Sequence, residues 1–93
     1  MAFCDPLSVD PARDFIAVDD VFATHVSEIY NVFHQPTQEW YYLPNQTANE
    51  VLLFNGFDSA CNLERAVPHC SFSLGAEAVG QRESIEVRAI VFF

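Results

Sequence analysis

Apolar and polar residues alternate most clearly at the C-terminal end of the chain, over residues 82–93. One set of alternate positions is apolar from residue 85 onward and consists of Ile85, Val87, Ala89, Val91 and Phe93. The other set is polar before it turns apolar, and its polar members are Arg82, Ser84, Glu86 and Arg88. Successive side chains of a strand point to opposite faces, so the pattern predicts a long strand with one face on a core.

Shorter β-prone runs precede this segment. Residues 15–22, 26–34 and 39–43 are rich in Val, Ile, Phe and Tyr, and turn residues separate such pieces at intervals of roughly ten residues. The sequence therefore predicts a single all-β domain over residues 1–93. The loop at Gln35-Pro36 favours pairing of the second and third runs as a hairpin.

The stretch Thr47-Ala-Asn-Glu50 matches a helix capping box. A short helix could begin there and continue through residues 51–54. That apolar run is too short to show a period, so a turn followed by a strand fits equally well.

Composition limits the size of the core. In 93 residues, 51% are hydrophobic and 14% aromatic, which is enough apolar material for a folded domain. So short a chain buries only about two-thirds of its unfolded surface, so we expect apolar surface that a monomer cannot hide.

The charge balance excludes several partners. Thirteen acidic residues face four basic ones, giving a net charge of −9. Without a basic surface we expect no nucleic-acid or anionic membrane partner. No apolar run approaches a membrane span, and the first residues lack a signal-peptide pattern, so we expect a cytoplasmic protein.

The cysteines predict free thiols rather than disulfides or a zinc site. There are three, at Cys4, Cys61 and Cys70, with no CxxC motif. His69 directly precedes Cys70, and neighbours in a strand point apart, so the two should not form a catalytic dyad. Buried structural thiols in a reducing compartment are the expectation.

Several segments in this order resemble one family. They are Trp40-Tyr41-Tyr42, Glu50-Val-Leu-Leu-Phe54 with Phe57-Asp58-Ser59, Pro68-His69, and Arg82-Glu-Ser-Ile-Glu-Val-Arg88-Ala with Val91-Phe-Phe93. Together they resemble the C-terminal part of the fungal hydroxylase/desaturase family of Fe(II)/2-oxoglutarate-dependent oxygenases of secondary metabolism. The resemblance implies a partial double-stranded β-helix, a jelly-roll-like antiparallel sheet.

The resemblance also assigns residues to a site. His69 matches the late histidine ligand of the family's iron, and Arg82-Glu83-Ser84 matches the Arg-x-Ser that binds 2-oxoglutarate. The family's His-x-Asp/Glu motif is absent here. The prediction is therefore that no metal and no cofactor is bound, with Fe(II) and 2-oxoglutarate as the alternative.

Half a jelly roll leaves open sheet edges and an uncovered apolar face. Self-association is the simplest remedy. We therefore expect an obligate homodimer, two copies packing face to face and burying well over ~1,000 Å².

Three functions follow from these observations. The first is a metal-independent cyclase or isomerase acting on a small natural product. In it His69 would be the acid/base and Arg82 would stabilise negative charge, while the substrate-binding residues would be Ser84, Arg88, Glu86, Trp40 and Tyr42. The second is an oxygenase, a hydroxylase or desaturase completed by a missing half or partner. The third is a non-catalytic binding module.

Overall fold

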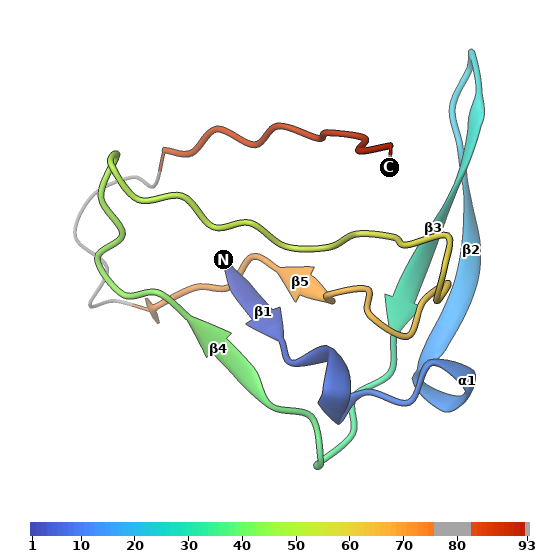
Figure 1. Ribbon diagram of the computed structural model, residues 1–93, viewed down its shortest axis with the longest axis horizontal. Helices are drawn as coiled ribbons and strands as arrows, with labels where there is room; N and C mark the ends of the chain where they lie inside the picture. Colours follow the sequence, from blue (N-terminus) through green and yellow to red (C-terminus); the bar gives the residue numbers. More distant parts are fainter. Residues whose placement is uncertain (76–82, 93) are drawn as a thin grey trace.

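Antiparallel strands dominate the computed structural model, which describes residues 1–75 and 83–92 (Figure 1). The prediction of an all-β fold is confirmed. The strands and short helices follow one another as β1 (Ala2–Cys4), a 3₁₀ turn (Pro6–Ser8), α1 (Pro11–Asp14), β2 (Phe15–Val21), β3 (Val26–Val32), β4 (Trp40–Tyr42) and β5 (His69–Cys70).

Strands β2 and β3 form a regular hairpin of seven residue pairs, from Phe15 opposite Val32 to Val21 opposite Val26. The turn is closed by a hydrogen bond from the Phe22 amide to the His25 carbonyl, 2.9 Å long. Both strands lie where the sequence predicts them. The turn between them is only four residues long, so it brings the two strands together locally.

The predicted hairpin of residues 26–34 with 39–43 is wrong. Strand β4 pairs with β1, while β3 pairs with β2. The connecting loop explains the difference. The Gln38 side-chain amide donates to the Phe33 carbonyl at 2.8 Å, and the Gln38 amide donates to the Gln35 carbonyl at 3.1 Å. These bonds form a local turn, and the chain then continues toward the N-terminal strand.

A second sheet has three strands in the order β4-β1-β5, all antiparallel to their neighbours. Its central strand is β1. Phe3 lies opposite Tyr41 on one side and opposite His69 on the other. The Cys4 amide extends this pairing by donating to the Pro68 carbonyl at 2.8 Å.

Helix α1 contains an ion pair between the half-exposed Arg13 and the buried Asp14. Asp10 caps this helix by accepting from the Ala12 amide at 3.1 Å, and Pro11 occupies the first helical position. Asp14 at its end is fully buried and accepts from Arg13 at 2.6 Å and 3.1 Å. Its carbonyl also accepts from the Phe33 amide at 2.8 Å, which ties α1 to the end of β3.

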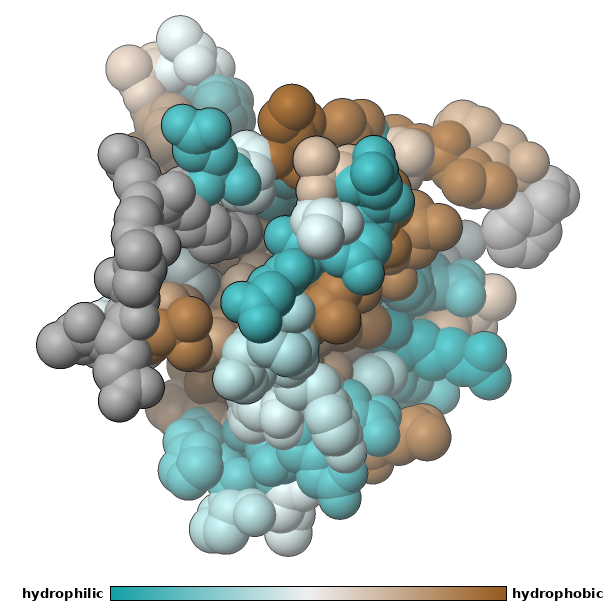
Figure 2. Space-filling view, turned by 90° about the vertical axis from the view of Figure 1, so that its left-hand side faces the viewer, coloured by the Kyte–Doolittle hydropathy of each residue, from teal (hydrophilic) through white to brown (hydrophobic). Residues whose placement is uncertain are grey.

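The apolar core is small. Among the described residues the buried apolar side chains are Cys4, Val9, Ala66 and Pro68. The surface area of 8192 Å² is about one and a half times that expected of a compact monomer of this mass. Apolar side chains accordingly appear over much of the surface (Figure 2). The expected excess of apolar surface is confirmed, whereas the expected packed core is not present in the part of the chain described.

The prediction of a C-terminal strand with one face on a core is wrong for the described residues. Residues 83–92 run extended, but no strand partner is assigned to them within the described ranges. Neither face is covered, since Ile85 on one face is 94% exposed and Phe92 on the other is 90% exposed. Alternation predicts an extended backbone, but pairing also needs a neighbouring strand with a free edge.

The capping-box residues make their hydrogen bond without a helix. Glu50 accepts from the Thr47 amide at 2.6 Å and from the Thr47 hydroxyl at 3.0 Å. Residues 51–54 then continue as neither helix nor paired strand. In the described segments no helix has the length and hydropathy that crossing a bilayer would need.

Candidate functional site

His69 is the candidate acid/base or metal ligand, and it lies exposed on the edge strand β5. Its Nδ1 lies 2.9 Å from the Val67 carbonyl oxygen. A carbonyl can only accept, so Nδ1 carries a proton. In the neutral ring Nε2 is therefore left with its lone pair, free to accept a proton or to bind a ligand.

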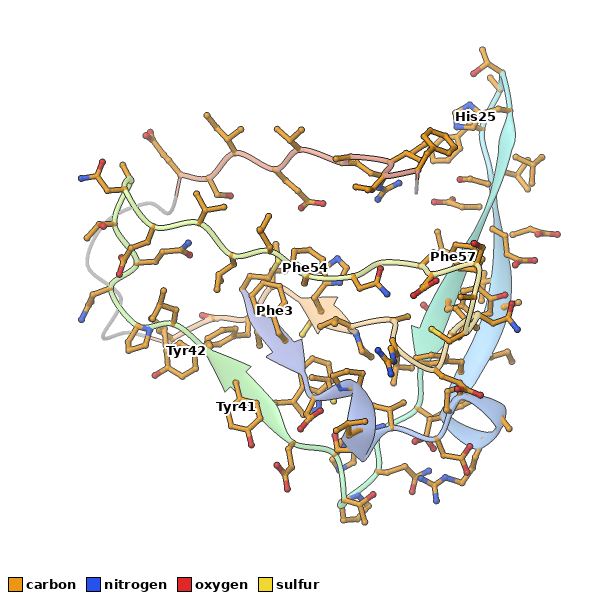
Figure 3. The ribbon with its side chains drawn as sticks, viewed as in Figure 1. Phe3, His25, Tyr41, Tyr42, Phe54 and Phe57 are labelled. Atoms are coloured by element: carbon orange, nitrogen blue, oxygen red, sulfur yellow. The ribbon has the colours of Figure 1, made fainter. Side chains whose placement is uncertain are left out.

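Two phenylalanine rings pack against this imidazole. The centroids of Phe54 and His69 are 4.6 Å apart, and those of Phe3 and His69 are 6.2 Å apart. Phe3 and Phe54 are themselves 4.9 Å apart (Figure 3). The three rings form one cluster, in which Phe3 comes from β1, His69 from β5 and Phe54 from the loop after the Thr47 turn.

An apolar groove of about 520 Å³ begins at these phenylalanines. Its walls include Phe3, Tyr41, Tyr42, Leu52, Phe54 and Val67. Pockets of about 300 to 1,000 Å³ with apolar walls are typical of small-molecule sites. His69 does not line the groove, but it contacts two of the residues that do.

The aromatic triplet divides in a way that the sequence predicts only in part. Tyr42, singled out from the sequence as substrate-binding, lines the groove, and so does Tyr41. Trp40 does not. It is 39% exposed and lies opposite Cys4, away from the groove. Tyr41 and Tyr42 both line the groove although they are neighbours on β4, so strict alternation along the strand does not account for which members of the triplet reach it.

Tyr41 is held as a hydrogen-bond donor. Its hydroxyl donates to Glu39 at 2.7 Å. This bond and the carboxylate charge raise the pKa of Tyr41 above its ordinary value. The phenol therefore stays protonated, and it presents a polar rim to an otherwise apolar groove.

The polar residues of the C-terminal segment are not brought to His69. Ser84, Glu86 and Arg88 are all exposed, and among the described residues no hydrogen bond or ion pair joins any of them to His69. Arg82 lies outside the described residues. Its predicted role, like the shared site with Ser84, remains a prediction.

The cysteines are all free. Cys4 is buried, as predicted, but Cys70 is exposed and Cys61 is half-buried. Burial and the neighbouring Asp58 raise the pKa of Cys61. None of the three thiols lines the groove.

A second hollow of about 490 Å³ lies at the 3₁₀ turn and α1, and its walls include Asp5, Asp10, Arg13 and Glu39. The Arg13 guanidinium is already committed to Asp14. The hydrogen bonds from Arg13, with one from the Asp10 amide, lower the pKa of Asp14 to about 2. The remaining charged walls of this hollow are therefore acidic, because Arg13 is already paired with Asp14. Such a hollow suits a structural role.

The sequence does not single out most of the groove residues, and Phe3, Leu52 and Phe54 are among those it misses. Phe3 lies in a three-residue strand, too short to show any period. Leu52 and Phe54 belong to the apolar run whose structure was left open. Only that run itself, an unusually apolar stretch after a turn, could have indicated them.

A metal site would need several ligand side chains close together in the described part of the chain. Within residues 1–75 and 83–92, no three histidine, cysteine or acidic side chains lie close enough to hold an ion. His69 is a single candidate ligand with a free Nε2 atom. These residues alone therefore do not fit the two-histidine, one-carboxylate iron site of the oxygenases that the sequence resembles.

Comparisons with known proteins give one consistent group. A family model described as "YDMC: Oxidoreductase/YMDC permease-like domain" matches residues 1–92. The alpha-ketoglutarate-dependent dioxygenase tstK of Talaromyces stipitatus is 45% identical over 67 residues, covering 69% of this chain and 24% of the relative. The hydroxylase/desaturase efuI of Hormonema carpetanum is 38% identical, covering 72% of this chain and 23% of the relative.

A third relative is matched over more of the chain. The Fe(II)/2-oxoglutarate-dependent dioxygenase nvfI of Aspergillus novofumigatus is 32% identical, covering 94% of this chain and 34% of the relative. The chain thus spans about a quarter to a third of the length of these relatives. No solved structure matches it.

Proposed function

Because the chain belongs to the oxidoreductase/YMDC permease-like domain family, with fungal 2-oxoglutarate-dependent dioxygenases among its relatives, we propose that it acts on a small natural product of secondary metabolism. The observation that carries this proposal is the apolar groove beside His69. It offers a flat, largely aromatic wall together with one titratable side chain.

The groove suits a flat, apolar substrate with few polar groups. Phe3 and Phe54 provide ring faces, and Leu52 adds an aliphatic wall. Tyr41, whose hydroxyl donates to Glu39, and Asn55 add polar groups to this lining. A substrate lying here would have its reactive end near His69.

One form of the proposal is metal-independent chemistry, cyclisation or isomerisation by positioning and proton transfer. It is supported by the donor set of the chain, in which none of the three histidines stands in a His-x-Asp or His-x-Glu motif. His69 would move a proton through Nε2, since Nδ1 is bonded to Val67. Arg82 and Arg88 would stabilise negative charge that develops on an enol or carboxylate.

The other form is oxygenation with Fe(II) and 2-oxoglutarate, and the names of the relatives favour it. The hydrogen bond from His69 Nδ1 to a backbone carbonyl is the arrangement by which metal-bound histidines are oriented. The remaining ligands would have to come from outside the described residues. Ser84, with Arg82, would then hold the 2-oxoglutarate carboxylate.

Iron binding separates the two forms. The protein is loaded anaerobically with ferrous iron, desalted and assayed for bound metal and for 2-oxoglutarate-dependent succinate formation. His69→Ala is compared with His34→Ala, which replaces another exposed histidine far from the ring cluster. One equivalent of iron that only His69→Ala abolishes supports oxygenation.

Conversion of a natural-product substrate without iron, lost in His69→Ala and retained in His34→Ala, supports metal-independent chemistry. A third result would overturn both forms. If Phe54→Ala and Tyr41→Ala leave binding of every flat aromatic test ligand unchanged, the groove is not a substrate site.

A further inference from the structure

The C-terminal segment 83–92 presents an unpaired strand edge. It is extended and exposed along its length, and it is the red run that ends at the C-terminus in Figure 1. Among the described residues, none of its backbone groups takes part in a backbone hydrogen bond. A row of free amides and carbonyls on an extended chain is a template for another strand.

The side chains of this segment restrict which strand can pair with it. Directly opposite residues in an antiparallel pair point to the same face of a sheet. Residues 85, 87, 89 and 91 are apolar, and the intervening positions carry Glu86 and Arg88. A partner strand therefore needs the same division into an apolar face and a charged face, with the charges reversed in order.

The segment itself meets this requirement when paired with a second copy about a two-fold axis at Val87. Glu86 of each copy then lies opposite Arg88 of the other, so both charged pairs are complementary. On the other face, Val87 lies opposite its own copy and Ile85 lies opposite Ala89.

Neighbouring antiparallel registers are worse. Centring the axis on Glu86 places two carboxylates opposite each other, and centring it on Arg88 does the same with two guanidinium groups. An axis between two residues places apolar side chains opposite charged ones. Among these registers, the one at Val87 pairs Glu86 with Arg88 on one face and places residues 85, 87 and 89 opposite apolar residues on the other, while Glu83 lies opposite Val91 and Ser84 opposite Ile90.

We infer that two copies of this chain pair through residues 83–92 as antiparallel strands about a two-fold axis at Val87. The pairing joins the edges of two sheets, which differs from face-to-face packing of two layers. Two chains with a net charge of −9 repel each other overall. At this contact, however, each copy brings one acidic and one basic side chain, so the local charges attract. The large exposed area of 8192 Å² leaves ample surface for the roughly 800 Å² per copy of a stable interface.

Charge reversal tests the register. Glu86→Arg alone and Arg88→Glu alone each create like-charge pairs, and each should weaken the dimer roughly ten- to thirtyfold. The double variant E86R/R88E restores complementarity and should dimerise as the wild type does. An equimolar mixture of the two single variants should form heterodimers. Sedimentation velocity over a concentration series measures each of these.

Cross-linking tests the position of the axis. In a Cys61→Ser/Cys70→Ser background, Val87→Cys should form a disulfide-linked dimer on mild oxidation, because residue 87 faces its own copy. Ile85→Cys alone should not, since its copies lie several residues apart. Ile85→Cys mixed with Ala89→Cys should cross-link.

Three results would each overturn the inference. The wild-type chain could remain monomeric up to about 100 µM, a concentration at which even a weak dimer forms. Both single charge variants could dimerise as tightly as the wild type. Ile85→Cys alone could cross-link as readily as Val87→Cys, which would place the contact elsewhere.

Discussion

The ring of Phe54 lies against the imidazole of His69, with centroids 4.6 Å apart and planes inclined at 55°. This contact connects the apolar groove to the one histidine that the proposed chemistry uses. Phe3 completes the cluster from the central strand, and its own ring centroid lies 4.9 Å from that of Phe54. A substitution of Phe54 should therefore alter both the wall of the groove and the surroundings of the His69 ring.

Phe54→Ala is expected to lower the free energy of unfolding by about 1 to 2 kcal/mol, less than a fully buried phenylalanine would, because Phe54 is only half-buried. Phe57→Ala removes a ring of the same loop that is 63% exposed, and it should cost much less. Urea unfolding measures both values. The ¹H shifts of the His69 ring should change in the first variant only, and equal changes in both variants would contradict the contact.

Asp14 should give the protein a marked acid sensitivity. Its pKa is lowered to about 2 from an ordinary value of 3.8, chiefly by the hydrogen bonds from Arg13. A carboxylate with a depressed folded-state pKa stabilises the fold above pH 4, and this contribution is lost as the pH falls from about 4 to about 2. Asp14→Asn should lower stability at pH 7 and flatten this part of the pH profile.

The matched control for Asp14 is Asp20→Asn, which changes an exposed carboxylate on β2 opposite the neutral Ser27. Urea unfolding at pH 7 and pH 3 compares the two variants. If Asp14→Asn keeps the wild-type slope between these values, the Arg13–Asp14 pair does not control acid stability.

The Tyr41 phenol should titrate at a lower pH once Glu39 loses its charge. The raised pKa of Tyr41 depends on the hydrogen bond to the Glu39 carboxylate and on the charge of that group. Glu39→Gln removes the charge, so the ionised phenol is penalised less and its pKa falls. Absorbance at the tyrosinate band during a pH titration measures the change.

The control for this titration is the double variant Tyr41→Phe/Glu39→Gln, compared with Tyr41→Phe alone. These two should have superimposable titration curves. Glu28→Gln should shift a different phenol, Tyr30, whose hydroxyl donates to Glu28 at 2.8 Å and whose pKa is raised in the same way.

The β2–β3 hairpin carries a like-charge pair that can be corrected. Asp19 lies directly opposite Glu28, and like charges opposite each other destabilise a sheet. Asp19→Lys should raise the free energy of unfolding by about 0.5 to 1 kcal/mol. Asp20→Lys makes the same change of charge opposite the neutral Ser27, so it separates the pair from the net charge. Thermal unfolding at low salt measures the difference in stability between the two variants. Equal effects of Asp19→Lys and Asp20→Lys would argue against a destabilising Asp19–Glu28 pair.

Local sequence patterns predict the strands better than their partners. Residues 15–22 and 26–34 read correctly as strands because composition and turn residues act locally. The pairing of β4 with β1 depends on contacts between Trp40–Tyr42 and Ala2–Cys4, far apart in sequence, which no local pattern encodes. For the same reason alternation over residues 83–92 predicts the extended backbone and says nothing of a neighbour.

The sequence predicts the family to which the chain is related, but it predicts only some of the residues of the candidate site. The resemblance to fungal 2-oxoglutarate-dependent oxygenases is confirmed by the comparisons, and Tyr42 does line the groove. Trp40 does not line the groove, although alternation along a strand places it on the same face as Tyr42. The sequence does not indicate Phe3, because its role depends on its position between Tyr41 and His69 in the folded sheet.

The order β4-β1-β5 has a consequence for synthesis on the ribosome. Strand β1 is made first, yet its two neighbours begin at Trp40 and His69. The β2–β3 hairpin needs only a short loop to close, an event of microseconds, and it can form while later residues are still being added. Phe3 has both of its strand neighbours only once His69 has been made, so the cluster of Phe3, Phe54 and His69 is completed after the β2–β3 hairpin.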